Sequence, residues 1–130
     1  MSLMDDAAAL LGAMGAADAA ADPLLAYIVS SVTERVQNET NRAGVPSGLR
    51  RAAAELAAGE YLALKKNAGQ LDMEGLDLEA AVKQIQEGDT NTVFAVGDGS
   101  MTPEQRLDLL IDRLRRDRSR EFLRYRRLVW

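Results

Sequence analysis

Apolar side chains recur at helical spacing after Asp22, which is suited to cap a helix, and Pro23, which is suited to its first position. The apolar positions of this segment are Leu25, Ile28, Val29, Val32 and Val36. At about 100° per residue they lie within about 100° of one another, so the pattern predicts an amphipathic helix with one buried face. The face expected to be exposed carries Ser30, Glu34, Arg35 and Asn38.

A second helical pattern follows a turn that contains Gly44 and Pro46. Ser47 is suited to cap this helix, which is expected to end near Asn67 and Gly69. Its expected core positions are Leu49, Ala53, Leu56, Ala57, Tyr61 and Leu64. Several alanines let another helix approach closely, which favours packing within the chain over a contact between subunits. These alanines are Ala52, Ala53, Ala54, Ala57 and Ala58. The whole segment, residues 22–69, is predicted to be a helical hairpin.

Residues 1–21 carry a weaker pattern. An Ala-rich run from Asp5 to Leu11 predicts a short helix, and the glycines after it favour a helix end followed by a loop. Because Met4 is a second methionine, residues 1–3 could be a remnant of recombinant expression, and they are left out of the predicted fold.

Residues 79–97 follow a polar, loop-like stretch, and their sequence pattern favours β-structure. Thr92–Val96 is the most β-prone run of the chain, and it comes after the turn residues Gly88 and Asp89. The pattern predicts a β-hairpin over residues 79–97, with a helix from Glu79 to Glu87 as the competing interpretation. An isolated hairpin is marginal in water, so it needs the chain's own helices, a further strand from Leu128–Trp130 or a neighbouring subunit as its partner.

Residues 102–124 predict an Arg-rich amphipathic helix. Thr102 and Gln105 match a capping box, and Pro103 fits the first helical position. The expected apolar face comprises Leu107, Leu110, Ile111, Leu114, Phe122 and Tyr125. The pattern leaves open whether this helix continues unbroken through Arg118 or bends there.

The charges separate an acidic body from a basic C-terminal end. The chain has 16 Lys and Arg against 20 Asp and Glu, a net charge of −4, but residues 101–130 alone carry nine arginines and five carboxylates, a net charge of +4. The tail, residues 125–130, ends on the only tryptophan, Trp130, so we expect it to be held against protein. This polarity is suited to docking.

Composition narrows the fold and the chemistry. The 130 residues include 21 alanines, 5% aromatic residues and neither Cys nor His, which favours one mainly α-helical domain. Without thiols and imidazoles, disulfide scaffolds, Cys or Ser-His nucleophiles and ordinary zinc sites are excluded. The carboxylates of residues 72–79 are expected to be solvated, and Gly97–Ser100 lacks the spacing of a phosphate-binding loop. We expect no catalytic residue, no metal and no cofactor. No apolar run reaches the length of a membrane span, so we expect a cytoplasmic protein.

Five arginines form one stripe if the C-terminal helix is continuous. They step by three or four residues and are Arg113, Arg116, Arg120, Arg124 and Arg127. Such a stripe can bind a phosphate backbone without reading sequence, but it is also typical of a solvated helix face with pairs such as Asp117 with Arg120. The pattern favours the solvated face.

Six short segments, in order, resemble one known family. They are Asp22-Pro23-Leu24-Leu25, Asn38-Glu39-Thr40-Asn41, Val45-Pro46-Ser47-Gly48-Leu49, Ala57-Ala58-Gly59-Glu60-Tyr61-Leu62, Glu87-Gly88-Asp89-Thr90 and Tyr125-Arg126-Arg127-Leu128-Val129-Trp130. Over roughly residues 22–130 the chain resembles the head-tail connector proteins of tailed bacteriophages and prophages, which complete the head and act in DNA packaging.

The resemblance implies a small bundle of three to four helices with a β-hairpin between the last two. It also implies that the subunits form a ring under the portal. This ring would be a virion component whose subunits are made in the bacterial cytoplasm. Double-stranded DNA would pass through the channel of the ring without specific binding. The partners would be other copies of the chain, the portal protein and the next connector or stopper on the tail side. No catalytic residue is implied.

Carried onto this sequence, the resemblance suggests a set of partner and subunit contacts. These are Gly88, Asp89, Thr92, Phe94, Arg113, Arg116, Arg120, Arg124, Tyr125, Arg126, Arg127 and Trp130. The alternative is a small helical regulator that binds DNA through the Arg-rich helix. Recognition helices usually mix Asn, Gln, Ser and Thr with Arg to read base edges, and here Arg alone dominates, which disfavours that alternative.

Overall fold

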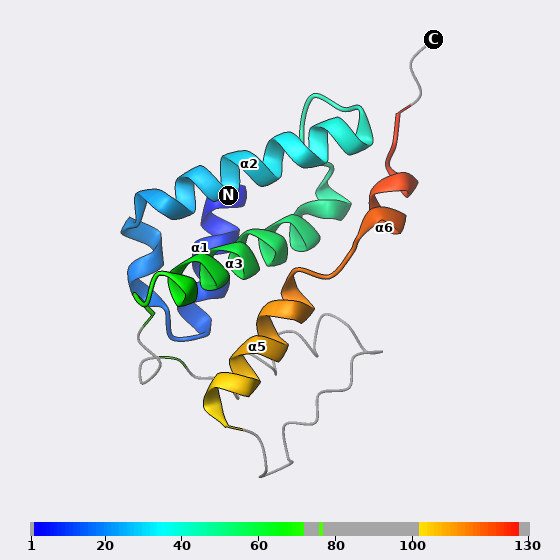
Figure 1. Ribbon diagram of the computed structural model, residues 1–130. Helices are drawn as coiled ribbons and strands as arrows, with labels where there is room; N and C mark the ends of the chain where they lie inside the picture. The colour runs from blue at the N-terminus through cyan, green and yellow to red at the C-terminus, as the bar shows by residue number, and fades with distance from the viewer. Residues whose placement is uncertain (1, 72–75, 77–101, 128–130) are drawn as a thin grey trace.

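The computed structural model describes residues 2–71, 76 and 102–127, and over these residues the protein is mainly helical (Figure 1). The α-helices are α1 (Leu3–Ala13), α2 (Pro23–Thr40), α3 (Arg50–Asn67), α5 (Pro103–Leu114) and α6 (Ser119–Arg124). Two 3₁₀ helices, η1 (Ala17–Ala21) and η2 (Ser47–Leu49), precede α2 and α3. The predicted β-hairpin, residues 79–97, lies outside the described residues.

Helix α1 begins earlier than the sequence predicted. The Ser2 hydroxyl accepts a hydrogen bond from the Asp5 amide at 3.1 Å, and the Asp5 carboxylate accepts one from the Ser2 amide at 3.1 Å. This reciprocal cap starts the helix at Leu3, so leaving Ser2 and Leu3 out of the fold is wrong. The helix buries Ala7 and Leu11.

Helix α2 has the predicted buried face. The Asp22 carboxylate caps it by accepting a hydrogen bond from the Leu24 amide at 2.9 Å. The side chains buried on its inner face are Leu25, Ile28, Val29, Val32, Val36 and Thr40. The predicted outer residues Ser30, Glu34, Arg35 and Asn38 are exposed. The helix ends at Asn41, whose φ of 55° is left-handed and turns the chain away.

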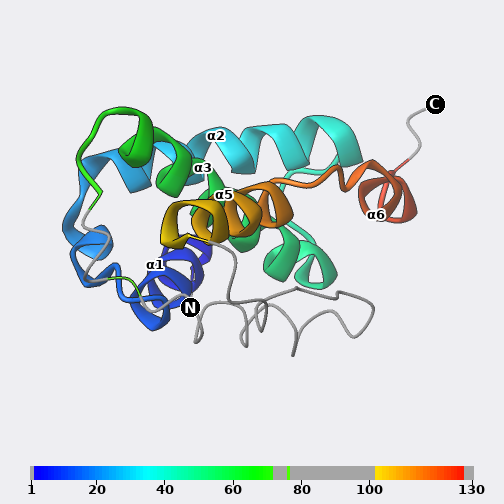
Figure 2. The ribbon, with the colours of Figure 1, turned by 60° about the horizontal axis from the view of Figure 1, so that its bottom comes forward.

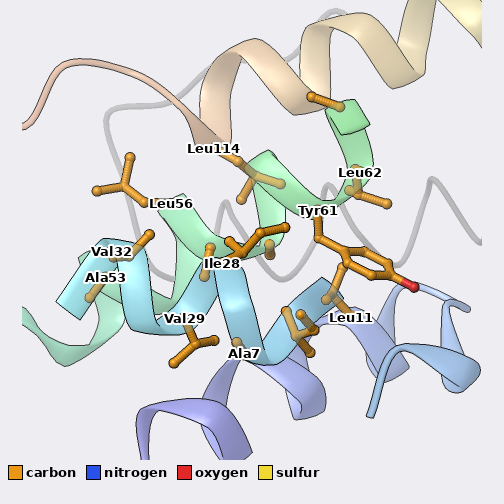
Figure 3. Packing of buried hydrophobic residues seen from close by; sticks show 14 of the residues in the cluster. Ala7, Leu11, Ile28, Val29, Val32, Ala53, Leu56, Tyr61, Leu62 and Leu114 are labelled. Atoms are coloured by element: carbon orange, nitrogen blue, oxygen red, sulfur yellow. The ribbon is translucent and has the colours of Figure 1, made fainter. Parts of the chain in front are cut away.

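Helix α3 packs against α1, α2 and α5, and it supplies much of the apolar core (Figures 2 and 3). All five alanines singled out in the sequence are buried, namely Ala52, Ala53, Ala54, Ala57 and Ala58. Their small side chains let neighbouring helices approach closely, so the prediction of packing within the chain is confirmed.

Two predictions for the ends of α3 are wrong. Ser47 does not cap it, because Ser47–Leu49 first forms η2 without a side-chain capping bond, and Leu49 immediately precedes α3. Leu64 belongs to the last turn and is 43% exposed, so it is not a core residue among those described. The predicted end is confirmed, since α3 stops at Asn67 and Gly69 follows with a φ of 69°.

Helix α5 begins with the predicted capping box. The Thr102 amide donates to the Gln105 side chain at 3.0 Å, and the Gln105 amide donates to the Thr102 hydroxyl at 3.1 Å. The helix buries Leu107, Leu110, Ile111 and Leu114, as the pattern predicted.

The Arg-rich helix is interrupted at residues 115–118, so of the two possibilities that the pattern left open, the helix does not continue unbroken through Arg118 but divides into α5 and α6. The Arg118 guanidinium turns into the protein and donates to the Leu114 carbonyl at 3.0 Å. The Asp117 carboxylate accepts a hydrogen bond from the Ser119 amide at 2.9 Å. Both side chains bind backbone groups at the interruption. Such local bonds compete with the hydrogen bonds of a continuing helix, which favours an end of the helix here.

Candidate interaction surface

The last described residues of the chain are fastened to the C-terminal end of α2, where Figures 1 and 2 both place α6. The Arg127 amide donates to the Thr40 carbonyl at 2.7 Å, and the Asn41 side-chain amide donates to the Arg127 carbonyl at 3.0 Å. The Arg42 guanidinium donates to the Tyr125 carbonyl at 2.5 Å. The described part of the tail is therefore held against the protein, as the sequence predicted.

The same segment is also seated on the turn between α2 and α3. A Cβ added at Gly48 would lie 1.9 Å from the Tyr125 hydroxyl oxygen, so only glycine leaves room for this half-buried ring. The Arg126 guanidinium donates to the Glu39 carbonyl at 3.1 Å. The tail thus begins from a fixed position and not from a free end.

A buried ion pair fixes the linker between α5 and α6. The Arg118 guanidinium lies 2.9 Å from the Glu55 carboxylate of α3, and the two residues are only 3% and 5% exposed. Burial lowers the pKa of Arg118, while the Glu55 charge acts in the opposite direction. Arg116 and Arg51 extend this contact at 3.9 Å and 4.0 Å from the same carboxylate. Outside it, Arg115 pairs with Glu60 at 2.8 Å.

The five arginines would form one stripe only on a continuous helix, and the interruption divides them into two groups. Arg113 and Arg116 belong to the α5 side and are partly buried, and Arg116 approaches Glu55. On the other side of the linker, the exposed arginines are Arg120, Arg124, Arg126 and Arg127, and Tyr125 among them is half-buried. The other predicted contact residues lie outside the described part of the chain, namely Gly88, Asp89, Thr92, Phe94 and Trp130.

The sequence analysis did not select Arg118 or Glu55, although one signal for Arg118 exists. Arg118 follows Leu110 and Leu114 at intervals of four, so it occupies a position of the apolar face and not of the arginine stripe. A cation at such a position indicates a buried partner. Nothing in the local sequence identifies Glu55 as that partner, because it is 63 residues away.

The exposed side of α6 combines cations with an apolar side chain. Arg120, Leu123 and Arg124 lie within about 100° on this helix, opposite the buried Phe122. Leu123 is 64% exposed, and no ion pair joins Arg120 or Arg124 to another residue that the structure describes. We call Arg120, Leu123, Arg124 and the neighbouring Arg127 the basic α6 surface.

A second polar cluster joins the start of α2 to the end of α3. The Asp22 carboxylate lies 2.7 Å from Lys65 and accepts a hydrogen bond from the Tyr61 hydroxyl at 2.9 Å. The Lys65 ammonium, followed by the Leu24 amide, lowers the pKa of Asp22. Burial and then the bond to Asp22 raise the pKa of Tyr61 to about 12. The neighbouring cavity is about 210 Å³, but the polar groups of this cluster satisfy one another, so it serves as a connection between helices.

Residues 2–71, 76 and 102–127 also form a groove between α1 and α3. Within these ranges no group of three or more carboxylates could hold a metal ion, and no helix is long and apolar enough to cross a membrane. The larger groove, about 680 Å³ between α1 and α3, contains the pair of Arg50 with Asp6 at 2.6 Å. We take the basic α6 surface as the candidate interaction site, because Arg120 and Arg124 are exposed there beside the exposed Leu123.

Comparison of this chain with protein-family models, curated proteins and solved structures finds no match.

Proposed function

We propose that this protein is a structural head-tail connector subunit of a tailed phage or prophage, which assembles as a ring under the portal and lets DNA pass. The observation that carries the proposal is the fixed C-terminal segment. Its backbone is bonded to Thr40, the last residue of α2, and to Asn41, which follows it, while Arg120, Arg124 and Arg127 are exposed. A structural adaptor needs such a rigid platform for a docking tail, and the six sequence segments support the same family.

The proposal assigns each part of the chain a mechanical role. The helices form the body of the subunit, the predicted hairpin over residues 79–97 contributes to the channel or the subunit contact, and residues 128–130 dock on the portal. The basic α6 surface meets a protein partner. In this proposal the chain is not an enzyme and is located in the virion.

The structure disfavours the alternative, a DNA-binding regulator that uses the Arg-rich helix. A recognition helix enters the major groove as a continuous rod that presents polar side chains to base edges. Here α6 has six residues, and the interruption at residues 115–118 separates Arg113 and Arg116 from Arg120 and Arg124. No uninterrupted helix carries the arginine stripe.

Light scattering combined with negative-stain imaging tests the proposal over a series of protein and salt concentrations. Closed rings, either of the free protein or on portal rings of the same phage, are expected. A stable dimer that binds duplex DNA sequence-specifically would overturn the connector in favour of the regulator.

Truncation separates docking from folding. Removal of residues 128–130 keeps the bonds of Tyr125 and Arg127 to α2, whereas removal of residues 125–130 deletes them. Both truncations are expected to abolish portal docking, but only the longer one should lower the thermal stability of the subunit. Docking that survives the longer truncation would refute the tail as the portal anchor.

A further inference from the structure

Four large apolar side chains are strongly exposed among the described residues, and two of them lie in oppositely charged surroundings. Leu123 is 64% exposed on the basic α6 surface, and Leu109 is 42% exposed on α5. The others are Tyr27 and Leu64. An exposed leucine inside a charged rim is typical of a protein contact, where an apolar centre is surrounded by polar residues.

Leu109 has two carboxylates on one side of it on α5, and Arg106 and Arg113 lie on its other side. Asp108, Leu109 and Asp112 lie within about 100° on α5, and all three are exposed. Asp108 also pairs with Lys66 of α3 but keeps 56% of its side chain exposed. We call Asp108, Leu109 and Asp112 the acidic α5 surface.

The acidic α5 surface and the basic α6 surface match in kind. Each places one leucine beside two like charges on one side of a helix, and the charges of the two surfaces are opposite. Within the described part of one chain no ion pair joins the two surfaces, and the non-helical linker 115–118 separates α5 from α6. The complement of each surface is therefore available on another copy.

We propose that the basic α6 surface of one copy binds the acidic α5 surface of the next, with Leu123 against Leu109 and with Arg120 and Arg124 against Asp108 and Asp112. Because the two surfaces differ, the contact is heterologous, and its repetition closes a ring or extends a filament. The inference rests on the proposed function, since it names the subunit contact of the proposed ring.

The exposed leucine is the reason to prefer a second copy over nucleic acid as the occupant. A phosphate backbone is bound by cations and by polar groups, and it gains nothing from an apolar side chain at the centre of the site. A protein surface with a leucine and two carboxylates pairs with all three side chains of α6.

Reciprocal charge reversal tests the contact. The variant R120E/R124E reverses the two charges of the basic α6 surface that face the carboxylates in the proposed contact, and D108K/D112K reverses both charges of the acidic α5 surface. Sedimentation velocity of each variant, of their equimolar mixture and of the wild type is measured at about 50 mM and about 500 mM salt, because exposed charge pairs are screened at the higher concentration. Circular dichroism checks that both variants fold.

We expect the wild type to self-associate, more strongly at low salt. Each variant alone should lose self-association by about tenfold or more, and their mixture should regain it by alternating the two chains. The combined variant with all four reversals should also regain it. Glu34→Lys reverses an exposed charge elsewhere on α2 and should leave association unchanged.

Leucine substitution gives a test that does not depend on charge. Leu123→Ser and Leu109→Ser should each weaken association at both salt concentrations, while Leu64→Ser, whose side chain is 43% exposed against 42% for Leu109, is the matched control. Equal effects of all three substitutions would overturn the assignment of Leu109 and Leu123.

The outcomes separate this contact from the proposed function. Rings that persist in both reversal variants would overturn the contact and leave the connector standing. A wild type and a mixture that stay monomeric at both salt concentrations would also overturn it, while rings on the portal would still support the connector. If Arg120 and Arg124 bind duplex DNA and Leu123→Ser has no effect, the partner of the basic α6 surface is nucleic acid and not a second copy of the chain.

Discussion

The two ends of the described sequence are attached to the rest of the protein in different ways. Helices α1 and α2 bury apolar side chains against α3, whose buried face carries several alanines (Figure 3). The C-terminal part also buries leucines of α5 and Phe122, but its linker and tail are held by polar bonds of Arg118, Arg42 and Asn41. Helical periodicity in the sequence therefore accounts for the packing of α1 and α2 and for the apolar contacts of the C-terminal part. It does not account for the polar bonds that hold the linker and the tail.

The difference lies in what each attachment requires of the sequence. Apolar packing needs a repeated pattern on both partners, and this pattern is visible at each helix separately. A buried ion pair or a backbone bond needs one residue at each end, and the partners are 63 residues apart for Glu55 and Arg118. Such contacts set the position of α6. The basic α6 surface therefore depends on polar contacts that the local sequence pattern does not predict.

Removing the buried carboxylate should break the polar attachment with the largest effect. Glu55→Ala leaves Arg118 buried without its charge partner, and we expect a loss of about 3–5 kcal/mol in the free energy of unfolding. Urea denaturation measures it. The double variant Glu55→Leu/Arg118→Met removes both charges and should recover most of this loss. A loss below about 1 kcal/mol in the single variant would mean that the pair does not fix the linker.

Enlarging an alanine should break the apolar attachment with a somewhat smaller effect. Ala57 is fully buried, so Ala57→Leu forces helices apart and should cost about 1–3 kcal/mol in the free energy of unfolding. Leu64→Ala on the exposed side of the same helix is the control, with an expected change within about 0.5 kcal/mol. Equal unfolding midpoints for the two variants would contradict close packing at Ala57.

A change at Gly48 should loosen the tail alone. Gly48→Ala displaces the Tyr125 ring, and we expect a cost of about 0.5–1.5 kcal/mol together with faster hydrogen exchange of the Arg127 amide. Gly44→Ala is the matched control, since a Cβ there meets nothing within 4 Å. Unchanged hydrogen exchange of the Arg127 amide would show that the backbone bonds of the tail do not depend on the position of the Tyr125 ring.

Titration of Tyr61 should give the smallest and most local effect. Its pKa is raised from 10.0 to about 12, so the stability it contributes is complete below pH 10 and is lost as pH rises toward 12. The Asp22→Asn substitution removes the acceptor charge, and the absorbance change of tyrosinate formation should then move to lower pH. The lowered pKa of Asp22 acts at acidic pH, where the stability that this carboxylate contributes is lost as the pH falls below its ordinary value of 3.8. An unchanged Tyr61 titration in the variant would show that the hydroxyl does not bind Asp22.

The success and failure of sequence interpretation follow the same division. The buried face of α2, the alanines of α3 and the capping box of Thr102 were predictable, because each depends on residues near one another in the chain. Ser2 was missed because the first residues were set aside. The end of α5 was not predictable, since the interruption coincides with contacts of Arg118 to Glu55 that the local pattern does not contain. The exposed arginines of α6 were identified, but their separation from Arg113 and Arg116 follows from that interruption.

The buried pair has a consequence for the order in which the chain folds during synthesis. Glu55 leaves the ribosome 63 residues before Arg118, an interval of about 3–13 s at ordinary rates of translation. Until Arg118 arrives, the carboxylate has only Arg51 of its own helix nearby, at 4.0 Å. It therefore has to stay partly hydrated or take up a proton, because a charge without a close partner is costly in an apolar site. Full closure of helices α1 to α3 around an ionised Glu55 carboxylate therefore awaits the synthesis of Arg118.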